Sequence, residues 1–266
     1  MIYFETEILE SFIEGDVNMS RSYGSLTALG QAGFMVKTGD VCIVIDPYLS
    51  YSVDDGDKWV RKMPPPMLPS EMTDADYVLL SHDHLDHVDP ETLMGIAAVS
   101  PNCKFAASAW YAVRRLTEIG ISEDRIISLE SDVTFVISDY VTVTPIPAAH
   151  EELHPCSPGG YEELGFIITS GDQSIYHGGD TCVYEGLCER IRGVNIAILP
   201  VNGRDETRHQ MNCIGNMNAE EAAKLAHDAG IGCVIPCHWE LYELNGETPE
   251  NIRAAFAKYP DVKYIL

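Results

Sequence analysis

Short apolar runs bounded by turn residues recur along the chain and predict a series of buried strands. The run 41–45 is entirely apolar and ends at Asp46-Pro47, and the run 77–80 ends at a strongly polar segment. Apolar runs of about four to eight residues are typical of strands that are covered on both faces. We expect further strands at 141–144, 195–199, 231–235 and 263–266, and a hairpin that pairs 165–169 with 174–177.

Helix signals separate several of these strands. Asp89-Pro90 combines an acidic N-cap with proline in the first turn, which is a common way for a helix to begin. Residues 218–230 open with a capping box and close at a glycine. Two more helices are predicted over 108–120 and from 248 onwards. The alternation of strand and helix signals indicates a mixed α/β or α+β chain.

One segment fits neither pattern. Residues 54–70 combine charged side chains with several prolines and Trp59. A loop of this length is either functional, for example a lid over a site, or an ordinary solvated connection. Both interpretations stay open at the level of sequence.

Composition bounds the class of protein. The chain has 266 residues with 45% hydrophobic content, which is enough for one large core, so we expect a single domain over 1–266. No apolar run approaches the roughly 18 residues of a membrane span, and the N-terminus has no pattern of a secretion signal. Eight cysteines occur without a C-x-x-C pair. They are typical of reduced thiols, so we expect a cytoplasmic protein.

The charge balance restricts the partners. The chain has 17 Lys and Arg residues and 41 Asp and Glu residues, which gives a formal net charge of −24. A polyanion such as a nucleic acid would be repelled by this field, and no large basic cluster overrides it. We therefore expect a small-molecule substrate and no nucleic-acid or membrane partner. A homo-oligomer remains compatible with the sequence.

Residues 81–87 carry the strongest chemical signal. They read Ser-His-Asp-His-Leu-Asp-His, and imidazole nitrogens and carboxylate oxygens are the ligands that hold Zn²⁺, Mn²⁺ or Fe²⁺. In an extended or turning segment, His82 and His84 point the same way and can share one ion. Asp86 and His87 follow the turn and can face a second ion. A single turn cannot close two coordination spheres, so other segments must supply donors.

Four other candidate donors follow predicted strands. Asp46, His150, Asp180 and His238 each stand at or just after a strand end, so several strands would deliver ligands to one edge of the molecule. The carboxylate of Asp180 has two oxygens and could bridge two ions. Two ions about 3.5–4 Å apart can hold a hydroxide and polarise a substrate oxygen.

The order of these residues resembles the metal-binding pattern of the metallo-β-lactamase superfamily, from Gly30 to about Trp239. The resemblance implies a four-layer αββα sandwich with the site at one edge of the two sheets. It implies two divalent metal ions, Mn or Zn with Fe also possible. The implied ligands are His82, His84 and His150 for one ion, Asp86, His87 and His238 for the other, and Asp180 as the bridge. Asp46 matches the aspartate of the superfamily's first motif, which supports the histidine turn.

Several motifs are similar to a narrower group, the L-ascorbate-6-phosphate lactonase-like branch. They include Gly30-Gln31-Ala32-Gly33-Phe34, Ile45-Asp46-Pro47-Tyr48 and Tyr176-His177-Gly178-Gly179-Asp180-Thr181. The segment 202–217 also shares features with a subgroup of that branch, although the chain is shorter than the lactonase and differs from it in this segment. We expect residues there that bind an anionic small-molecule substrate, because arginines can hold a phosphate or carboxylate and asparagines can orient ester or hydroxyl groups. The candidates are Arg204, Arg208, Asn212 and Asn216, and an ordinary surface loop is the alternative.

Three functions are compatible with this pattern. The first is a metal-dependent hydrolase whose metal-bound hydroxide attacks a small ester or lactone, such as a phosphorylated sugar lactone, with Asp86 orienting the hydroxide and moving its proton. The second is a phosphodiesterase acting on a small phosphodiester. The third is a di-iron redox protein. Redox members commonly have an acid at the position of His84, and no flavin domain is present in this chain.

Overall fold

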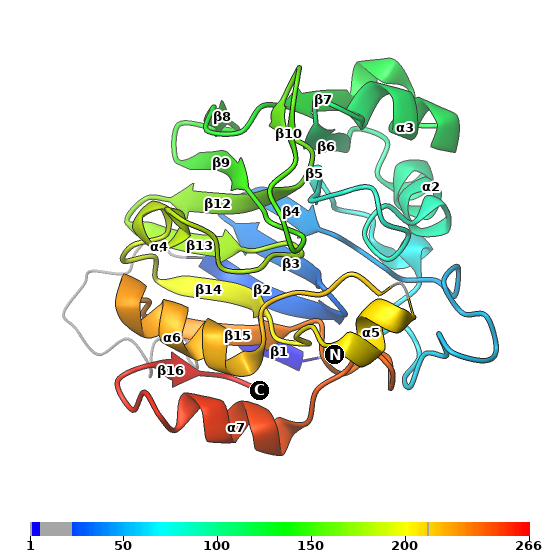
Figure 1. The fold of residues 1–266 in the computed structure, drawn as a ribbon. Helices are drawn as coiled ribbons and strands as arrows, with labels where there is room; N and C mark the ends of the chain where they lie inside the picture. The colour runs from blue at the N-terminus through cyan, green and yellow to red at the C-terminus, as the bar shows by residue number, and fades with distance from the viewer. Residues whose placement is uncertain (1, 6–22, 212) are drawn as a thin grey trace.

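The computed structural model describes residues 2–5, 23–211 and 213–266, and it consists of two packed sheets with helices on the outside (Figure 1). The first sheet has the strand order β1-β2-β3-β4-β5-β6-β7, antiparallel from β1 to β4 and parallel from β4 to β7. Its strands are β1 (Ile2–Glu5), β2 (Tyr23–Gly30), β3 (Gly33–Thr38), β4 (Val41–Ile45), β5 (Tyr77–Leu80), β6 (Lys104–Ser108) and β7 (Ile126–Leu129).

The second sheet has the order β16-β15-β14-β13-β12-β9-β8, and β13 to β16 are parallel. Its strands, in chain order, are β8 (Phe135–Val136), β9 (Val141–Pro147), β12 (Leu164–Ser170), β13 (Gln173–His177), β14 (Ile196–Pro200), β15 (Cys233–Cys237) and β16 (Lys263–Tyr264). A separate small ribbon pairs β10 (Pro155–Cys156) with β11 (Gly160–Tyr161).

Three apolar clusters define four layers. Ile43 and Ile45 of β4 face Phe166 and Ile198 of the second sheet, whereas the intervening Val44 faces the helices on the other side. This alternation is the period of two that a strand imposes on its side chains. Helices α2 (Pro90–Val99) and α3 (Ala112–Ile119) cover the first sheet, and α4 (Leu187–Arg190), α6 (Ala219–Ala229) and α7 (Pro249–Phe256) cover the second. The expected αββα sandwich is therefore confirmed.

The helix ends agree with the predicted signals. The Asp89 carboxylate accepts hydrogen bonds from the backbone N–H groups of Glu91 and Thr92, and α2 begins at the following proline. The capping box of α6 is present, and the helix ends at Gly230 with a φ of 66°. Short helices α5 (Glu206–Gln210), η1 (Pro69–Glu71) and η2 (Glu123–Arg125) lie in connecting segments.

The predicted helix over 108–120 is wrong at its start. Residues 104–108 form β6, which pairs in parallel with β5 on one side and β7 on the other, and α3 begins only at Ala112. The small residues Ala106 and Ala107 gave no strong strand signal, and the buried ladder on both sides decides their conformation. The predicted end of the helix at Gly120 is correct, since this glycine adopts a left-handed C-cap.

The segment 54–70 packs against the chain just after β15. The Arg61 side chain is 8% exposed and donates to the carbonyl groups of Tyr48 and Ser50, at 3.2 and 2.9 Å. The Trp59 ring meets the Tyr242 ring edge-on, with the ring centroids 5.4 Å apart. The segment is thus anchored beside the strand ends at Trp59 and Arg61, while most of its other residues are exposed, and its action as a lid stays a hypothesis.

Candidate metal centre

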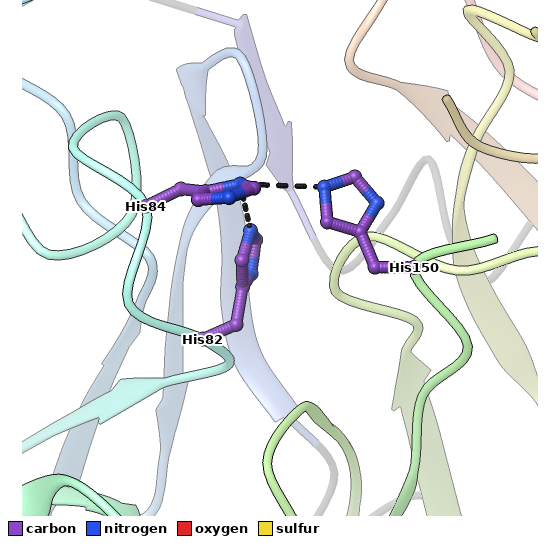
Figure 2. A group of neighbouring side chains, drawn as sticks. All are labelled: His82, His84 and His150. Atoms are coloured by element: carbon purple, nitrogen blue, oxygen red, sulfur yellow. Dashed lines mark hydrogen bonds between the residues drawn. The ribbon is translucent and has the colours of Figure 1, made fainter. Parts of the chain in front are cut away.

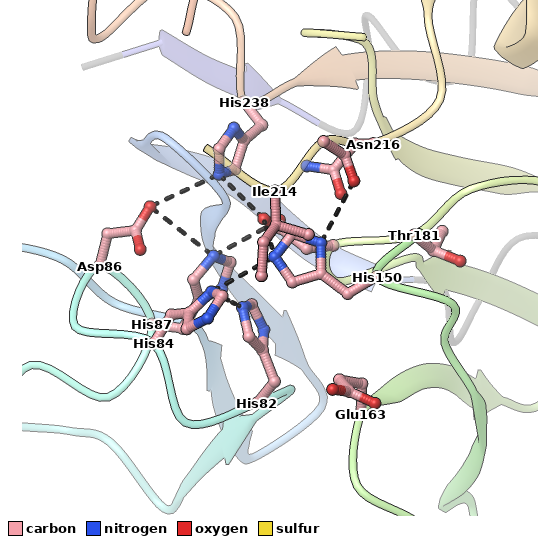
Figure 3. Close-up of polar contacts among 12 residues, drawn as sticks. His82, His84, Asp86, His87, His150, Glu163, Thr181, Ile214, Asn216 and His238 are labelled. Carbon is pink, nitrogen blue, oxygen red and sulfur yellow. Dashed lines mark hydrogen bonds and ion pairs between the residues drawn. The ribbon is translucent and has the colours of Figure 1, made fainter. Parts of the chain in front are cut away.

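The carboxyl ends of five strands converge at one edge of the sandwich. Strands β4, β5 and β9 lead into Asp46, the histidine turn 81–87 and His150, and strands β13 and β15 lead into Asp180 and His238. Because parallel neighbours end at the same edge, residues far apart in the sequence meet there. Figure 3 shows most of these side chains pointing toward one another.

His82, His84 and His150 form a first group (Figure 2). His84 Nδ1 lies 2.9 Å from His82 Nε2 and 3.3 Å from His150 Nε2. Their three ligand atoms lie within 4.8 Å of one another, so a single cation can reach all of them.

Asp86, His87 and His238 form a second group (Figure 3). Asp86 Oδ2 lies 3.4 Å from His238 Nε2 and 3.8 Å from His87 Nε2. The two groups adjoin, since the ring centroids of His82 and His87 are 4.1 Å apart. A third candidate group, His82, His87 and Asp180, overlaps both, so the division of the ligands between two ions stays what the resemblance implies.

The Asp180 carboxylate lies between the two groups. Its Oδ1 is 3.4 Å from His87 Nε2, and its Oδ2 is 3.3 Å from His238 Nε2 and 3.8 Å from His150 Nε2. The segment after Asp180 also holds the segment before His150, because Ala149 N donates to Thr181 Oγ1 at 3.0 Å. This position is compatible with the bridging role that the resemblance implies, which stays a prediction.

Two buried atoms of this centre have no hydrogen-bond partner among the described residues: His87 Nε2 and Asp180 Oδ1. Buried polar atoms are nearly always satisfied, so two orphans facing each other call for a missing partner. A nitrogen lone pair and a carboxylate oxygen are both electron donors, and a cation satisfies both at once. The residues present thus fit a bound metal ion.

The electrostatics of the metal-free site point the same way. Burial alone would lower the pKa of His87, but Asp180, Asp86 and Asp46 together raise it well above its usual value. Burial would likewise raise the pKa of Asp180, yet His238 and His87 hold it well below the usual range. Both shifts reflect the negative charge gathered around His87 and the histidines around Asp180, and a divalent ion bound there would balance the carboxylates.

The Asp46 carboxylate fixes the histidine turn from behind. It accepts hydrogen bonds from Ser81 N at 2.8 Å and Ser81 Oγ at 2.6 Å, and its Oδ2 lies 2.9 Å from His87 Nδ1. With Nδ1 donating to Asp46, the Nε2 atom of His87 is left free to bind a cation.

Backbone strain concentrates around the centre. Of the described residues other than glycine, five have a positive φ, and four of these belong to the site or flank it: Gln31, Asp46, Glu151 and His238. Left-handed conformations of such residues cost free energy and persist where the surroundings impose them. The strain is consistent with side chains held in place for a task.

The predicted substrate-binding segment is held mainly by its own polar pairs. The Arg204 guanidinium makes a two-pronged contact with Glu221, at 2.7 and 2.8 Å. Arg208 pairs with Asp205 and donates to the Gly246 carbonyl at 2.8 Å. Both guanidinium groups have partners, but the buried Nε atom of Arg208 has none among the described residues, and contact of either arginine with a substrate stays a prediction.

Of the two predicted asparagines, Asn216 lies in the described part of the chain. Asn216 is buried and donates through Nδ2 to Asn202 Oδ1 at 3.1 Å, while its own Oδ1 has no partner among the described residues. Asn212 lies outside the described residues. The segment nevertheless touches the centre, because His150 Nδ1 lies 3.3 Å from the Gly215 carbonyl oxygen.

Sequence reasoning missed Gln31 and Ser81 as parts of this centre. Gln31 Nε2 donates to Asp86 Oδ2 at 2.9 Å, although the two residues come from different elements. The available signal was the Gly30-Gln31-Ala32-Gly33 turn, in which glycines flank a residue at the end of a strand. Ser81 was visible only as the residue before the histidine turn.

Burial sets the protonation of the first group. It lowers the pKa of His150 from 6.5 to about 4 and lowers the pKa of His82 well below its usual value. In the metal-free protein, we expect His150 to titrate near 4 in an NMR titration, with its signal assigned by its absence from His150→Gln. Its contribution to stability is complete above about 6.5 and is lost as the pH falls toward 4, because the unfolded chain binds the proton first. A midpoint at or above 6.5 would contradict this assignment.

An αββα sandwich that gathers histidines and aspartates into adjoining candidate ligand groups can hold metal ions that activate water for hydrolysis. The comparison with known families agrees: the model of the beta-lactamase superfamily domain matches residues 42–239, well over half of the 266-residue chain. The chain belongs to this superfamily, the metallo-β-lactamase superfamily of metal-dependent hydrolases.

Its curated relatives carry a general description. A UPF0173 metal-dependent hydrolase from Pyrobaculum arsenaticum is 25% identical over 85% of this chain and 88% of its own. Another from Aeropyrum pernix is 27% identical over 86% of this chain and 87% of its own. These relatives support metal-dependent hydrolysis and name no substrate.

Solved structures share the fold at low identity. Igni18, a metallo hydrolase from Ignicoccus hospitalis, aligns with a TM-score of 0.69 and 20% identity, over 91% of this chain and 93% of its own. An isothiocyanate hydrolase from Delia radicum gut bacteria aligns with a TM-score of 0.70 and 17% identity, over 91% of this chain and 96% of its own. CmlA, a diiron beta-hydroxylase from Streptomyces venezuelae, aligns with a TM-score of 0.64 and 15% identity, over 94% of this chain and 54% of its own. One fold thus supports different reactions. In the described residues of this chain, no helix is long and apolar enough to cross a membrane.

Proposed function

We propose that this chain hydrolyses a small ester or lactone with the help of two divalent metal ions. The observation that carries the proposal is the pair of adjoining ligand groups with Asp180 between them. Ions bound there would lower the pKa of a bound water molecule and polarise the substrate carbonyl. Manganese, zinc and iron are all compatible with this mixture of nitrogen and oxygen donors.

The residues of the chain have distinct tasks in this proposal. The three neutral histidines of the first group donate nitrogen lone pairs. The pKa of Asp86 is held low despite its burial, chiefly by His87 and His238, so its carboxylate is ionised at neutral pH. An ionised Asp86 can accept a hydrogen bond from the attacking water, orient it toward the carbonyl carbon and take up its proton.

The surroundings of the centre favour a substrate with less negative charge than the anionic one expected from the sequence. Arg204, Arg208 and Arg115 are each paired with a carboxylate, and the chain as a whole is strongly acidic. Ile214 is 45% exposed and lies among the side chains of the centre in Figure 3, where it offers an apolar contact for a carbon skeleton. A phosphorylated lactone such as L-ascorbate 6-phosphate is the narrower possibility, and it requires Arg204 or Arg208 to exchange its carboxylate partner for the phosphate.

A substrate panel tests the proposal. Protein reconstituted with Mn²⁺ or Zn²⁺ is assayed with neutral lactones, p-nitrophenyl acetate, a phosphorylated sugar lactone and bis-p-nitrophenyl phosphate. We expect hydrolysis of a lactone or ester that chelation abolishes and added metal restores. Hydrolysis of the phosphodiester without any lactone or ester would contradict the proposal and favour a phosphodiesterase.

A further inference from the structure

Gln31 reaches the second ligand group from a different part of the fold. It lies in the turn between β2 and β3, has a φ of 54° and is 3% exposed. Its terminal amide nitrogen lies 2.9 Å from Asp86 Oδ2 and 3.0 Å from His238 Nε2. Both atoms belong to residues of the second group.

The spacing of these atoms is that of neighbours in one coordination sphere. Asp86 Oδ2 and His238 Nε2 are themselves 3.4 Å apart. Ligands at about 2.1 Å from an ion are separated by about 3.0 Å at octahedral angles and about 3.4 Å at tetrahedral angles. An ion that touches Asp86 and His238 therefore has the end of the Gln31 side chain within reach.

The amide can present either of its ends to this position. In the metal-free site, its N–H donates to the Asp86 carboxylate, which is the favourable arrangement without a cation. A half-turn of the amide group exchanges nitrogen for oxygen at nearly the same place. The side-chain carbonyl oxygen is then a hard donor of the kind that Mn²⁺ and other oxygen-preferring ions accept.

The backbone of the turn is fixed to the site. His238 N donates to the Gln31 carbonyl at 3.0 Å, and His177 Nε2 donates to the Ala32 carbonyl at 2.7 Å. A Cβ atom on Gly33 would lie 3.1 Å from the Asp46 carbonyl oxygen, so the turn also packs tightly against β4. Gln31 is thus positioned in advance, which lowers the entropic cost of binding.

We propose that Gln31 is a ligand, through Oε1, of the ion held by Asp86, His87 and His238. The inference rests on the metal centre of the proposed function and deepens it. With the Asp180 carboxylate, this site would offer three oxygen donors beside two histidine nitrogens. That donor set would shift the metal preference of this site toward Mn²⁺ or Fe²⁺ and away from Zn²⁺. Zinc favours nitrogen and sulfur donors and usually binds only four ligands.

Metal affinity tests the inference directly. Metal-free wild type, Gln31→Leu and Gln31→Glu are titrated with Mn²⁺ and with Zn²⁺ in competition with a coloured chelator. In Gln31→Leu, we expect one of two Mn²⁺ sites to weaken by at least about tenfold and the Zn²⁺ affinity to change less. Gln31→Glu keeps an oxygen donor and should retain Mn²⁺ binding. Gln210→Leu removes an exposed amide whose Nε2 atom donates to Glu206 at 3.0 Å, and it serves as the control.

The outcomes separate this inference from the proposed function. Unchanged Mn²⁺ affinity in Gln31→Leu would overturn the inference. An equal loss of affinity for Mn²⁺ and Zn²⁺ that Gln31→Glu does not restore would also overturn it. If Gln31→Leu fails to fold, the visible spectra of Co²⁺-loaded wild type and Gln31→Glu decide, and identical spectra would overturn the inference. Wild type that binds both ions but hydrolyses no ester or lactone would contradict the proposed function and leave the ligand assignment supported. Wild type that binds no ion would contradict both.

Discussion

Replacing Asp180 with alanine is expected to lower kcat/KM by about 10³-fold and to reduce the amount of metal that copurifies with the protein. Asp180 contacts His87 and His238 on one side and His150 on the other, so its loss affects both ligand groups. Metal-ion stabilisation of transition-state charge is worth several kcal/mol, and about 4 kcal/mol corresponds to about 10³-fold in rate. Steady-state kinetics and elemental analysis of the purified variant measure the two effects.

A matched control is available in the same hairpin. Asp172 lies exposed in the turn between β12 and β13, away from the strand end that carries Asp180. Asp172→Ala should leave both kinetics and metal content unchanged. An Asp180→Ala protein with wild-type turnover and metal content would show that the carboxylate bridges nothing.

Replacing Asp46 with alanine is expected to act without any contact to the metal itself. The Asp46–His87 pair is completely buried, and removal of one partner of such a pair costs about 3–5 kcal/mol of stability. The variant also loses the acceptor that orients the His87 ring, and loss of this kind of support weakens metal binding by about 10- to 100-fold. Chemical denaturation and chelator competition measure the two effects separately.

Asp83 provides the control for this prediction. It belongs to the same histidine turn, but it points outward and pairs with Arg115 at 2.7 Å. We expect Asp83→Ala to change stability by less than about 1 kcal/mol, as is usual for exposed ion pairs, and to keep metal affinity. Equal behaviour of the Asp46 and Asp83 variants would contradict the role assigned to Asp46.

The sequence predicted the elements that have strong local signals. The apolar runs 41–45 and 77–80 are strands, and the capping residues of α2 and α6 lie where they were expected. Strand β6 was not predicted because Ala106 and Ala107 carry little strand propensity of their own, and their conformation depends on pairing with β5 and β7. Long-range pairing of this kind leaves no trace in a short window of sequence.

The site likewise combines residues that local sequence signals reveal with residues that only the fold brings together. The histidine turn and the three later donors were recognisable because their residue types are rare in combination and are characteristic of metal binding. The carboxylate partners of Arg204 and Arg208 were not recognisable from the sequence. Glu221 belongs to another element, and Asp205 contacts Arg208 only once α5 has formed. Gln31 was overlooked for a chemical reason: glutamine is an infrequent ligand, and its turn is distant in sequence from Asp86 and His238.

The central claim is that two metal ions at the strand ends make this chain a hydrolase of small esters or lactones. Its most direct test is a titration of the metal-free protein with Mn²⁺, in which bound metal and hydrolysis of a responsive lactone or ester are followed together. The account predicts no hydrolysis without metal and full activity as the bound metal approaches two ions per chain. Full activity in the metal-free protein, or two bound ions without hydrolysis of any ester or lactone, would contradict it.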